Sequence, residues 1–301
     1  MSKLKIQAHF ALLVANIIYS INYTVAKDVM PFYIGPSGFV LIRATGALLL
    51  FWLSGLLVKN EKIAFNDFGK LLLCGLFGVA INQLFFFEGL SLTSPINAAI
   101  IMVSTPILVL VFSSIIIKEK VTGNKVAGII LGVSGALLLI IGNSSIISGI
   151  QSNPLGDTFI FLNAASYAVY LVLVKSLMKK YSALTVIKWV FLFGIVFVIP
   201  IGFSQATAIE WAEIPQIIWY AIAFVVFGTT FLAYLLNTFA LKAVSPTVTA
   251  VYIYLQPLLA AMIALMFGKD ELDLIKVGSA ILIFTGVYLV SRKRKVMSLE
   301  S

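Results

Sequence analysis

Apolar residues fill most of this chain in blocks of about twenty, and the short segments between the blocks hold most of the charged residues. A helix needs about 20 residues to cross the hydrocarbon core of a bilayer, which is ~30 Å thick, so each block is long enough to span it. The pattern predicts ten membrane-spanning helices, at residues 9–27, 37–58, 68–89, 95–117, 123–142, 156–176, 184–203, 216–240, 246–267 and 273–291. We therefore expect an all-α integral membrane protein with no soluble domain between its spans.

The composition supports this class and excludes several others. The chain is 61% hydrophobic and 11% charged, with a mean hydropathy of +1.07. It has one histidine and one cysteine, Cys74, and it carries neither the HExxH pattern of zinc peptidases nor the phosphate-binding loop of nucleotide hydrolases. We therefore expect no enzyme, no ATP-driven pump, no metal and no cofactor. The first apolar block lacks a small-x-small cleavage site, so we expect it to be retained as a helix.

The basic residues fall on alternate connecting segments. If the N-terminus is cytoplasmic, 16 of the 21 Lys and Arg lie in cytoplasmic segments, and only Lys27, Lys269 and Lys276 lie outside. This is the positive-inside distribution of membrane proteins, and it accounts for the net charge of +9 without a nucleic-acid partner. We expect a multi-pass protein of the plasma membrane, the inner membrane of a bacterium, with both termini in the cytoplasm.

Two pairs of prolines interrupt apolar blocks at matching positions. Pro95 and Pro106 stand in the fourth predicted span, and Pro246 and Pro257 repeat their spacing 151 positions later, in the ninth. Proline costs about 3 kcal/mol in a helix interior, and the carbonyl that it frees needs protein or a water-lined cavity beside it. We predict that both spans are bent, line a central cavity and act as gates.

The repeat extends over nearly the whole chain. Residues 8–142 and 156–291 each hold five predicted spans. Because five is odd, the second half enters the membrane from the opposite face, and the two halves form an inverted repeat. Secondary transporters often follow this plan, with a binding site near the midplane between the halves.

Several duplicated motifs resemble those of a known family. They are the SP…P pattern of the fourth and ninth spans, the turns KEKVTGNKVAG (118–128) and KDELDLIKVGS (269–279), and the glycine-rich runs that follow each turn. The chain resembles the drug/metabolite transporter superfamily, specifically the ten-helix proteins built from two EamA-type repeats. The resemblance implies a transporter of small metabolites that works by alternating access. It also implies a cavity lined by helices one to four and six to nine, with helices five and ten at the periphery.

Four ionisable side chains within or at the ends of spans are functional candidates. Arg43 and Lys188 would flank the cavity, one toward each mouth, and favour an anionic substrate. The alternative for both is that the long side chain reaches the membrane interface. Glu88 and His9 are candidates for proton coupling, with a solvated helix end and an interfacial position as their respective alternatives.

Uncharged polar residues recur at helical spacing on several spans and should face inward, toward a ligand or toward neighbouring helices. The cavity candidates are Asn16, Tyr19 and Asn22 on the first span, Asn82 and Gln83 on the third, Asn97 on the fourth, Tyr167 and Tyr170 on the sixth, Tyr234 and Asn237 on the eighth, and Tyr252 and Gln256 on the ninth. Tyr23 and Asn163 belong to the same stripes.

These features predict a secondary active transporter that exports a small polar metabolite, such as an amino acid or a related carboxylate. The alternative within the superfamily is export of lipophilic cations, as by its short members, which depend on a glutamate in the middle of helix one. This chain has no acid there, and its corresponding region runs from Asn16 to Asn22. The expected partners are the small-molecule substrate and the lipid bilayer, and a monomer or a homodimer is compatible with the pattern.

Overall fold

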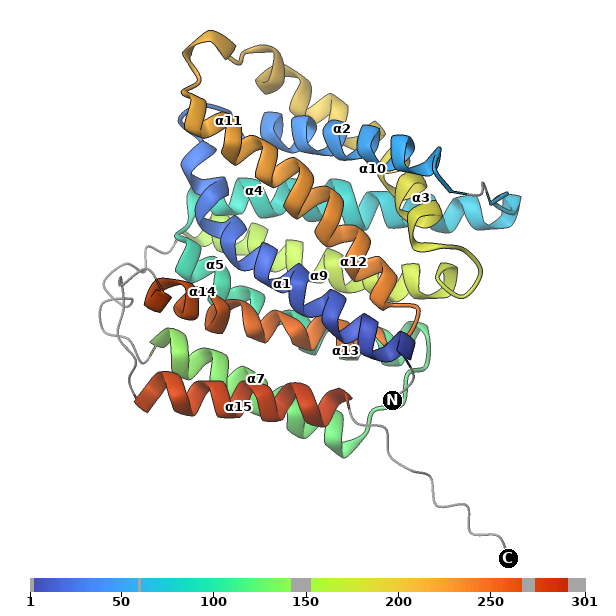
Figure 1. The fold of residues 1–301 in the computed structure, drawn as a ribbon, viewed down its shortest axis with the longest axis vertical. Helices are drawn as coiled ribbons and strands as arrows, with labels where there is room; N and C mark the ends of the chain where they lie inside the picture. Colours follow the sequence, from blue (N-terminus) through green and yellow to red (C-terminus); the bar gives the residue numbers. More distant parts are fainter. Residues whose placement is uncertain (1–2, 59–60, 142–152, 267–273, 292–301) are drawn as a thin grey trace, which may run out of the picture.

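A computed structural model describes residues 3–58, 61–141, 153–266 and 274–291, and this part of the chain consists of helices joined by short connections (Figure 1). The spans are formed, in chain order, by α1 (Lys3–Val29); α2 (Pro36–Gly55); α3 (Phe68–Gly75), η2 (Leu76–Ile81) and α4 (Asn82–Leu92); α5 (Pro95–Met102) and α6 (Thr105–Ile116); α7 (Gly123–Ile141); α9 (Pro154–Leu177); α10 (Ala183–Thr207); α11 (Gln216–Ala223), η4 (Phe224–Leu232) and α12 (Ala233–Ala240); α13 (Pro246–Val251), η5 (Tyr252–Tyr254) and α14 (Leu255–Met266); and α15 (Leu274–Ser291). Two short 3₁₀ helices, η1 (Phe65–Asp67) and η3 (Trp211–Glu213), precede the third and eighth spans.

The all-helical, ten-span prediction is confirmed. Eight helical stretches in the described part of the chain are long and apolar enough to cross a membrane. The two remaining predicted spans are α7 and the interrupted helix from α13 to α14. Residues 142, 267 and 273, which end or begin predicted spans, lie outside the described residues.

Contacts at the ends of the helices establish the direction of each half. Lys27, near the end of α1, donates a hydrogen bond to the carbonyl oxygen of Thr93 at 3.3 Å, just beyond α4. The Thr93 hydroxyl donates to Asp157 in the first turn of α9 at 2.8 Å. The helix α9 therefore begins where α1 finishes, and the two halves run in opposite directions, as predicted. We name the ends of the bundle after α1: the Lys3 end, where it begins, and the Val29 end, where it finishes.

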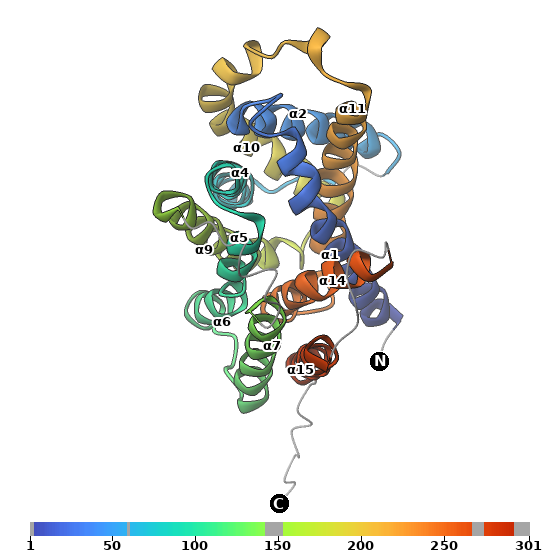
Figure 2. The same cartoon turned by 90° about the vertical axis from the view of Figure 1, so that its left-hand side faces the viewer.

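Helices related by the repeat occupy equivalent places in the bundle. The third span packs on the sixth through α4 and α9, and the first packs on the eighth through α1 and α12. The helix α2 packs on α10 at one edge, and α7 packs on α15 at the other (Figures 1 and 2). The fifth and tenth spans therefore lie at the periphery, as the resemblance implied.

Glycines bring α7 and α15 into close contact. A Cβ placed on Gly286 would lie 2.6 Å from the carbonyl oxygen of Gly128, and a Cβ on Gly128 would lie 2.7 Å from that of Gly286. Two helix backbones approach this closely only where small residues face each other. This contact accounts for the glycine-rich sequences of both spans.

The fourth and ninth spans are interrupted at the predicted prolines. Pro106 is the second residue of α6, and a short turn separates α6 from α5. Pro257 is the third residue of α14, which follows the 3₁₀ segment η5. At the start of each span a serine caps the helix: Ser94 accepts from the backbone N–H of Asn97, and Ser245 from that of Val248. The SP…P pattern thus encodes a capped start followed by a break.

The third and eighth spans each contain a π-helical segment, η2 and η4, which the sequence pattern did not predict. A π segment accommodates one extra residue in the turn, and such segments are frequent at functional sites. Each one changes the direction in which the following side chains point. Asn82 directly follows η2, and Tyr234 comes two residues after η4.

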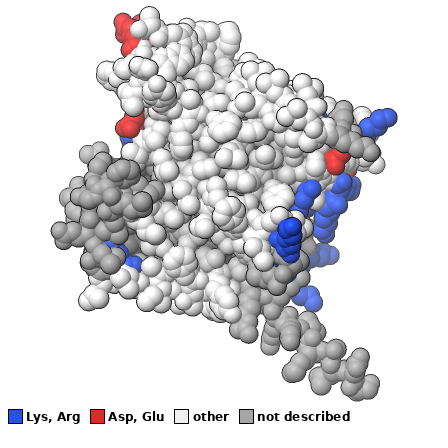
Figure 3. Space-filling model, viewed as in Figure 1, with Lys and Arg blue, Asp and Glu red and all other residues white. Residues whose placement is uncertain are grey.

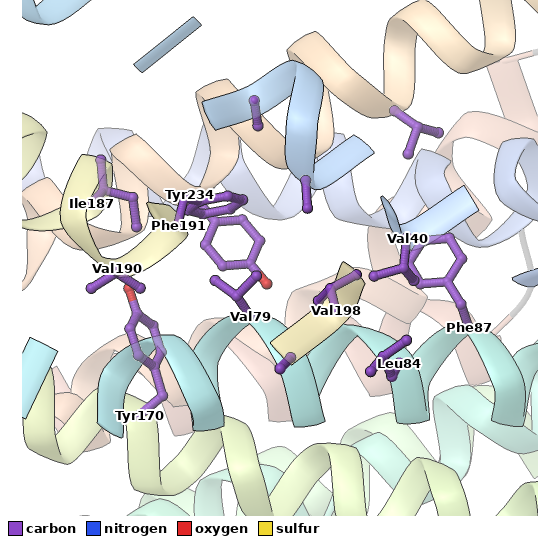
Figure 4. Close-up of a cluster of buried hydrophobic side chains, with 14 of the residues drawn as sticks. Val40, Val79, Leu84, Phe87, Tyr170, Ile187, Val190, Phe191, Val198 and Tyr234 are labelled. Carbon is purple, nitrogen blue, oxygen red and sulfur yellow. The ribbon is translucent and has the colours of Figure 1, made fainter. Parts of the chain in front are cut away.

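A core of aromatic and aliphatic side chains packs around these segments (Figure 4). The ring of Tyr170 lies so close to Gly78 of η2 that no Cβ would fit there. The ring of Phe191 packs edge-on against Tyr234, with 5.3 Å between ring centroids. This packing fixes the position of Tyr234, whose hydroxyl reaches the space between the halves.

Candidate functional site

A cavity lies between the two halves, about midway along the bundle. About 80 Å³ of it is open to the centres of water molecules. One water needs roughly 10–15 Å³ by this measure, so the cavity has room for several waters or for a compact ligand. The first to fourth, sixth, eighth and ninth spans contribute side chains to its walls.

Arg43 is the one residue with a formal charge among the described residues of the cavity wall, and it is only 3% exposed. Its Nε donates to the hydroxyl of Thr230 at 2.8 Å, and its guanidinium carbon lies 4.3 Å from the centre of the Phe87 ring. Within the described part of the chain no Asp or Glu lies within 4.0 Å of it. A buried cation without a carboxylate partner makes the cavity electropositive, because low-dielectric surroundings screen its charge poorly.

Tyr234 is at the centre of a polar network that joins the two halves. Its hydroxyl lies 3.0 Å from Asn82 Oδ1 and 3.2 Å from the carbonyl oxygen of Gly78, and it accepts from Gln83 Nε2 at 3.3 Å. Gln83 and Tyr234 are 151 positions apart, the same separation as the paired prolines. Side chains at repeat-related positions therefore meet directly at the interface between the halves.

Two further hydrogen bonds tie the first span to the second half. Gln256 Nε2 donates to Asn16 Oδ1 at 2.9 Å, and Asn237 Nδ2 donates to the hydroxyl of Tyr19 at 3.2 Å. These amides therefore bind neighbouring helices as well as lining the cavity. The polar side chains were expected to face either a ligand or neighbouring helices. In the structure these residues contact neighbouring helices and also line the cavity.

Four polar atoms of the cavity wall remain without a hydrogen-bond partner among the described residues. They are Asn22 Oδ1, Gln83 Oε1, Asn163 Oδ1 and Thr229 Oγ1, all of them buried. Buried polar atoms in proteins are almost always satisfied by protein, ordered water or ligand. Three of the four are carbonyl oxygens, which only accept hydrogen bonds, so a molecule bound in the cavity should supply hydrogen-bond donors.

Most of the predicted cavity residues do line the cavity. They are Asn16, Tyr19, Asn22, Arg43, Asn82, Gln83, Tyr167, Tyr234, Asn237 and Gln256, with Tyr23 and Asn163 from the same stripes. The residues that the sequence reasoning missed are Phe86, Phe87, Met102, Thr229, Thr249 and Ile253. Apolar members of this group carry no signal in a membrane sequence, whereas the two threonines are polar and extend the stripes of the eighth and ninth spans.

The prediction that Lys188 flanks the cavity is wrong. Its side chain is 7% exposed and lies outside the cavity wall, with its ammonium nitrogen 5.0 Å from the centre of a Trp52 ring. The helix α10 packs on α2 at the edge of the bundle, so this face of α10 meets α2 rather than the space between the halves. Its ammonium nitrogen lies 3.8 Å from the Cβ position of Gly55, the last residue of α2, so the alternative that it reaches toward the membrane interface stays a prediction.

Three other candidates lie away from the cavity wall. Asn97 is bound at the start of α5, where its amide contacts Asp157. The hydroxyl of Tyr170 lies 3.2 Å from that of Thr238. The hydroxyl of Tyr252 lies 2.7 Å from His9 Nδ1. All three side chains join helices to one another.

The candidates for proton coupling are also outside this cavity. Glu88 is half-buried and accepts a hydrogen bond from the Ser37 hydroxyl. His9 is half-buried and lines a second cavity, at the Lys3 end. Among the described residues there is no group of three or more His, Cys, Asp or Glu that could hold a metal ion.

Of the four prolines, Pro106 and Pro257 adjoin the breaks, and Pro95 and Pro246 begin helices. Pro106, Pro246 and Pro257 are not among the described residues of the cavity wall. The broken spans reach the cavity through neighbouring residues, Met102 in the fourth and Thr249, Ile253 and Gln256 in the ninth. Both spans are interrupted helices with residues in the cavity wall, and the gating role of their prolines stays a prediction.

Comparisons with known proteins agree with this architecture. The chain is 29% identical over 264 residues to the uncharacterized transporter YyaM of Bacillus subtilis (strain 168), which covers 86% of this chain and 85% of that protein. It is 25% identical over 335 residues to the protein WALLS ARE THIN 1 of Arabidopsis thaliana, covering 98% of this chain and 86% of the relative. A solved crystal structure has the same fold, with a TM-score of 0.76 at 16% identity over 97% of each chain.

The family model gives the most direct assignment. The model of the EamA-like transporter family matches residues 6–141 and again residues 154–292, one match for each half. The members of this family are transporters of the drug/metabolite superfamily, not enzymes. The chain therefore belongs to the EamA-like transporter family and is a multi-pass membrane transporter with two EamA domains.

Proposed function

We propose that this transporter exports a small amino acid, or a closely related zwitterion, by alternating access. The observation that carries the proposal is the pairing, in one cavity, of a cation with unsatisfied acceptors. Arg43 has no carboxylate partner in the described part of the chain, and the oxygens of Asn22, Gln83 and Asn163 have no donor. An amino acid brings the two groups that such a wall lacks, a carboxylate and an ammonium.

Arg43 suits the carboxylate end. A guanidinium carries five N–H donors in a planar fork, and Thr230 uses only the one on Nε. The terminal nitrogens are then free to bind both oxygens of a carboxylate, a geometry that Arg favours over Lys. The ring of Phe87 on one face of the guanidinium keeps that fork in a fixed orientation.

The amide oxygens suit the ammonium end. Each can accept one of the three N–H donors of a primary ammonium group. Tyr19, Tyr167 and Phe86 supply aromatic walls around the same space, which favours a substrate whose carbon skeleton is small and at least partly apolar. The free volume limits the substrate to a compact molecule.

Export of lipophilic cations, the alternative within the superfamily, finds less support. Such a substrate needs a carboxylate at the site, and the described lining residues contain none. The aromatic rings could attract a cation, but Arg43 repels it at the same place.

The basic residues support an orientation in the membrane. In the described part of the chain, those at the Lys3 end are Lys3, Lys5, Lys62, Lys70, Lys118, Lys120, Lys125, Lys175, Lys179, Lys180 and Lys242. On the visible face they gather along that side of the molecule (Figure 3). By the positive-inside rule we place the Lys3 end in the cytoplasm and the Val29 end outside, in the plasma membrane.

The test is transport by the purified protein in liposomes. Radiolabelled amino acids are compared with amines that lack the carboxylate and with acids that lack the amine. Arg43→Gln should weaken apparent affinity for amino acids roughly 10- to 100-fold, because charge-assisted hydrogen bonds contribute about 1.5–3 kcal/mol. Lys188→Gln is the matched control, a buried cation at the repeat-related position outside the cavity, and it should leave the affinity unchanged. Equal losses in the two variants, or equal transport of amines and amino acids, would refute the proposal.

A further inference from the structure

A second and larger cavity lies at the Lys3 end of the bundle. Its volume is about 540 Å³, measured as the space open to the centres of water molecules. Its walls come from four places: the start of α1, the segment from Glu119 to the first turn of α7, the connection that leads into α13, and the last turn of α15. It therefore touches elements of both halves, and it is separate from the central cavity.

The charge of this cavity is predominantly basic. Lys5, Lys120 and Lys125 line it, together with His9 and one carboxylate, Glu119. That carboxylate is already engaged: Lys125 Nζ lies 2.8 Å from one of its oxygens, and the Thr247 hydroxyl donates to the other at 3.0 Å.

The other two lysines of the cavity are not paired with a carboxylate in the part of the chain that the structure describes. Within the described residues, neither Lys5 nor Lys120 has a carboxylate within 4.0 Å. The charges of Glu119 and Lys125 cancel each other. The described lining residues therefore have a net positive charge, which comes from Lys5 and Lys120.

The same cavity offers neutral donors suited to a tetrahedral anion. Gly123 and Asn124 open α7, and the backbone N–H groups at the start of a helix have no partner within the helix. The N–H groups of the next two residues, Lys125 and Val126, bond to the carbonyl oxygen of Thr122, and Gly123 and Asn124 themselves line the cavity. The positive end of the α7 dipole adds to the attraction for an anion.

The remaining wall is apolar, and it points to the source of that anion. Val244, Val248 and Val290 line the cavity beside the polar groups. Free phosphate would gain nothing from valines, whereas a phospholipid has glycerol and acyl carbons next to its phosphate. Basic pockets between helices at the cytoplasmic surface of a membrane are suited to anionic lipid headgroups.

We propose that this cavity binds the phosphate group of an anionic phospholipid from the leaflet at the Lys3 end. Lys5 and Lys120 bind the charge, the first turn of α7 donates to the phosphate oxygens, and the valines pack on the adjoining carbons. Because the walls come from both halves, a bound lipid stabilises the arrangement in which these elements are together. The site is independent of Arg43 and of the substrate, so it does not require the proposed function to be correct.

The experiment measures thermal unfolding of the purified full-length chain in a neutral detergent. Phosphatidylglycerol, phosphatidylcholine and inorganic phosphate are each titrated in. We expect phosphatidylglycerol to raise Tm to a saturating value, with no comparable shift from phosphatidylcholine, because a ligand that binds only the folded state stabilises it by mass action.

Variants locate the site. Lys5→Gln/Lys120→Gln should abolish the phosphatidylglycerol shift, whereas Lys70→Gln/Lys179→Gln, with the same change of net charge at the same end, should retain it. Arg43→Gln should also retain it, which separates this site from the central cavity. A shift that persists in Lys5→Gln/Lys120→Gln overturns the proposal, as does the absence of any shift with phosphatidylglycerol. A shift produced by inorganic phosphate alone overturns the lipid as its source.

A second measurement does not depend on the variants folding. Native mass spectrometry of the unmodified protein, released from mixed micelles of the two lipids, should show phosphatidylglycerol retained in preference to phosphatidylcholine. Equal retention of the two lipids would contradict the proposal.

Discussion

Replacing Gly286 by alanine should separate the peripheral pair α7 and α15 and destabilise the protein. The added Cβ would lie 2.6 Å from the carbonyl oxygen of Gly128 and 2.8 Å from the backbone nitrogen of Gly132. Both neighbours are backbone atoms of one helix, so no side-chain rotation can make room. The two helices must move apart by several tenths of an ångström along a contact that runs through Gly128, Gly132 and Gly135.

The expected magnitude has two opposing parts. Overpacking of a tight contact costs about 1–3 kcal/mol. An exposed glycine replaced by alanine in a helix gains up to about 1 kcal/mol from helix propensity. Gly278, on the same helix, has no atom within 4 Å of its Cβ position, so Gly278→Ala shows the second part alone. The difference in free energy of unfolding between the two variants should therefore be about 1–3 kcal/mol, with Gly286→Ala the less stable.

The protein contains its own probe for this measurement. Cys74 is the only cysteine of the chain and is completely buried, so a thiol-reactive fluorophore labels it only as the fold opens. Melting curves of both variants in detergent, followed by this labelling, give the comparison directly. If Gly286→Ala and Gly278→Ala melt at the same temperature, the close glycine contact does not stabilise the fold and the reasoning fails.

Two predictions concern the breaks and the pH response. Pro106→Ala should slow exchange between inward-open and outward-open states because it favours a continuous fourth span, whereas Pro200→Ala, inside α10, should not. The assay is the rate at which a cysteine introduced at Thr229, in the cavity wall, is labelled in a Cys74→Ala background. Equal labelling rates in the two proline variants would contradict the prediction. Burial alone raises the pKa of Glu119, but the Lys125 ammonium and the hydroxyls of Ser245 and Thr247 outweigh it and hold that pKa below its ordinary value of 4.5. Glu119 therefore contributes stability above pH 4.5 that is lost as the pH falls through its lowered pKa. Glu119→Gln should show a flatter fall of Tm in acid, and an unchanged slope would exclude this role.

The sequence predicted the architecture because its determinants are local or periodic. Span lengths follow from hydropathy, and the inversion follows from an odd number of spans in each half. The breaks at Pro106 and Pro257 were predicted from the missing N–H and the ring of proline together with the recurrence of the pair in both halves; proline alone does not suffice, because Pro200 lies inside the continuous helix α10. Arg43 was found because a charge in an apolar span stands out against its neighbours.

The errors arise where orientation depends on packing. Arg43 and Lys188 look equivalent in the sequence, but α2 and α10 pack on each other, and only Arg43 reaches the space between the halves. Asn97 and Tyr252 lie on the right spans, yet they bond to Asp157 and His9, residues remote in the sequence.

The π-helical segments limit prediction in another way. They have no compositional signature, and each one shifts the helical register of the residues that follow. The hydrogen bond between Gln83 and Tyr234, which come just after η2 and η4, depends on both segments and could not be read from a constant helical period.

Some contacts of this structure recur in both halves, and others occur in only one of them. At the Val29 end Lys27 donates to the carbonyl oxygens of Leu90 and Thr93, and at the Lys3 end Lys175 donates to those of Leu241 and Val244. Each lysine thus ties the turn between the third and fourth helices of its own half to the first helix. Under the proposed mechanism of alternating access, equivalent local anchors at both ends should keep the inward-open and outward-open states close in free energy.

Selectivity has the opposite requirement, because a binding wall built from identical halves would present the same groups twice. Here the repeat places Gln83 opposite Tyr234 rather than opposite a second glutamine, and it places Arg43 in the cavity while Lys188 packs beside Trp52. Among its described lining residues the cavity therefore has one charged side, and we expect the proposed amino-acid substrate to bind it in a single orientation. A second cation introduced into the cavity wall should reduce the selectivity for zwitterionic over purely anionic substrates by more than it reduces the stability of the fold.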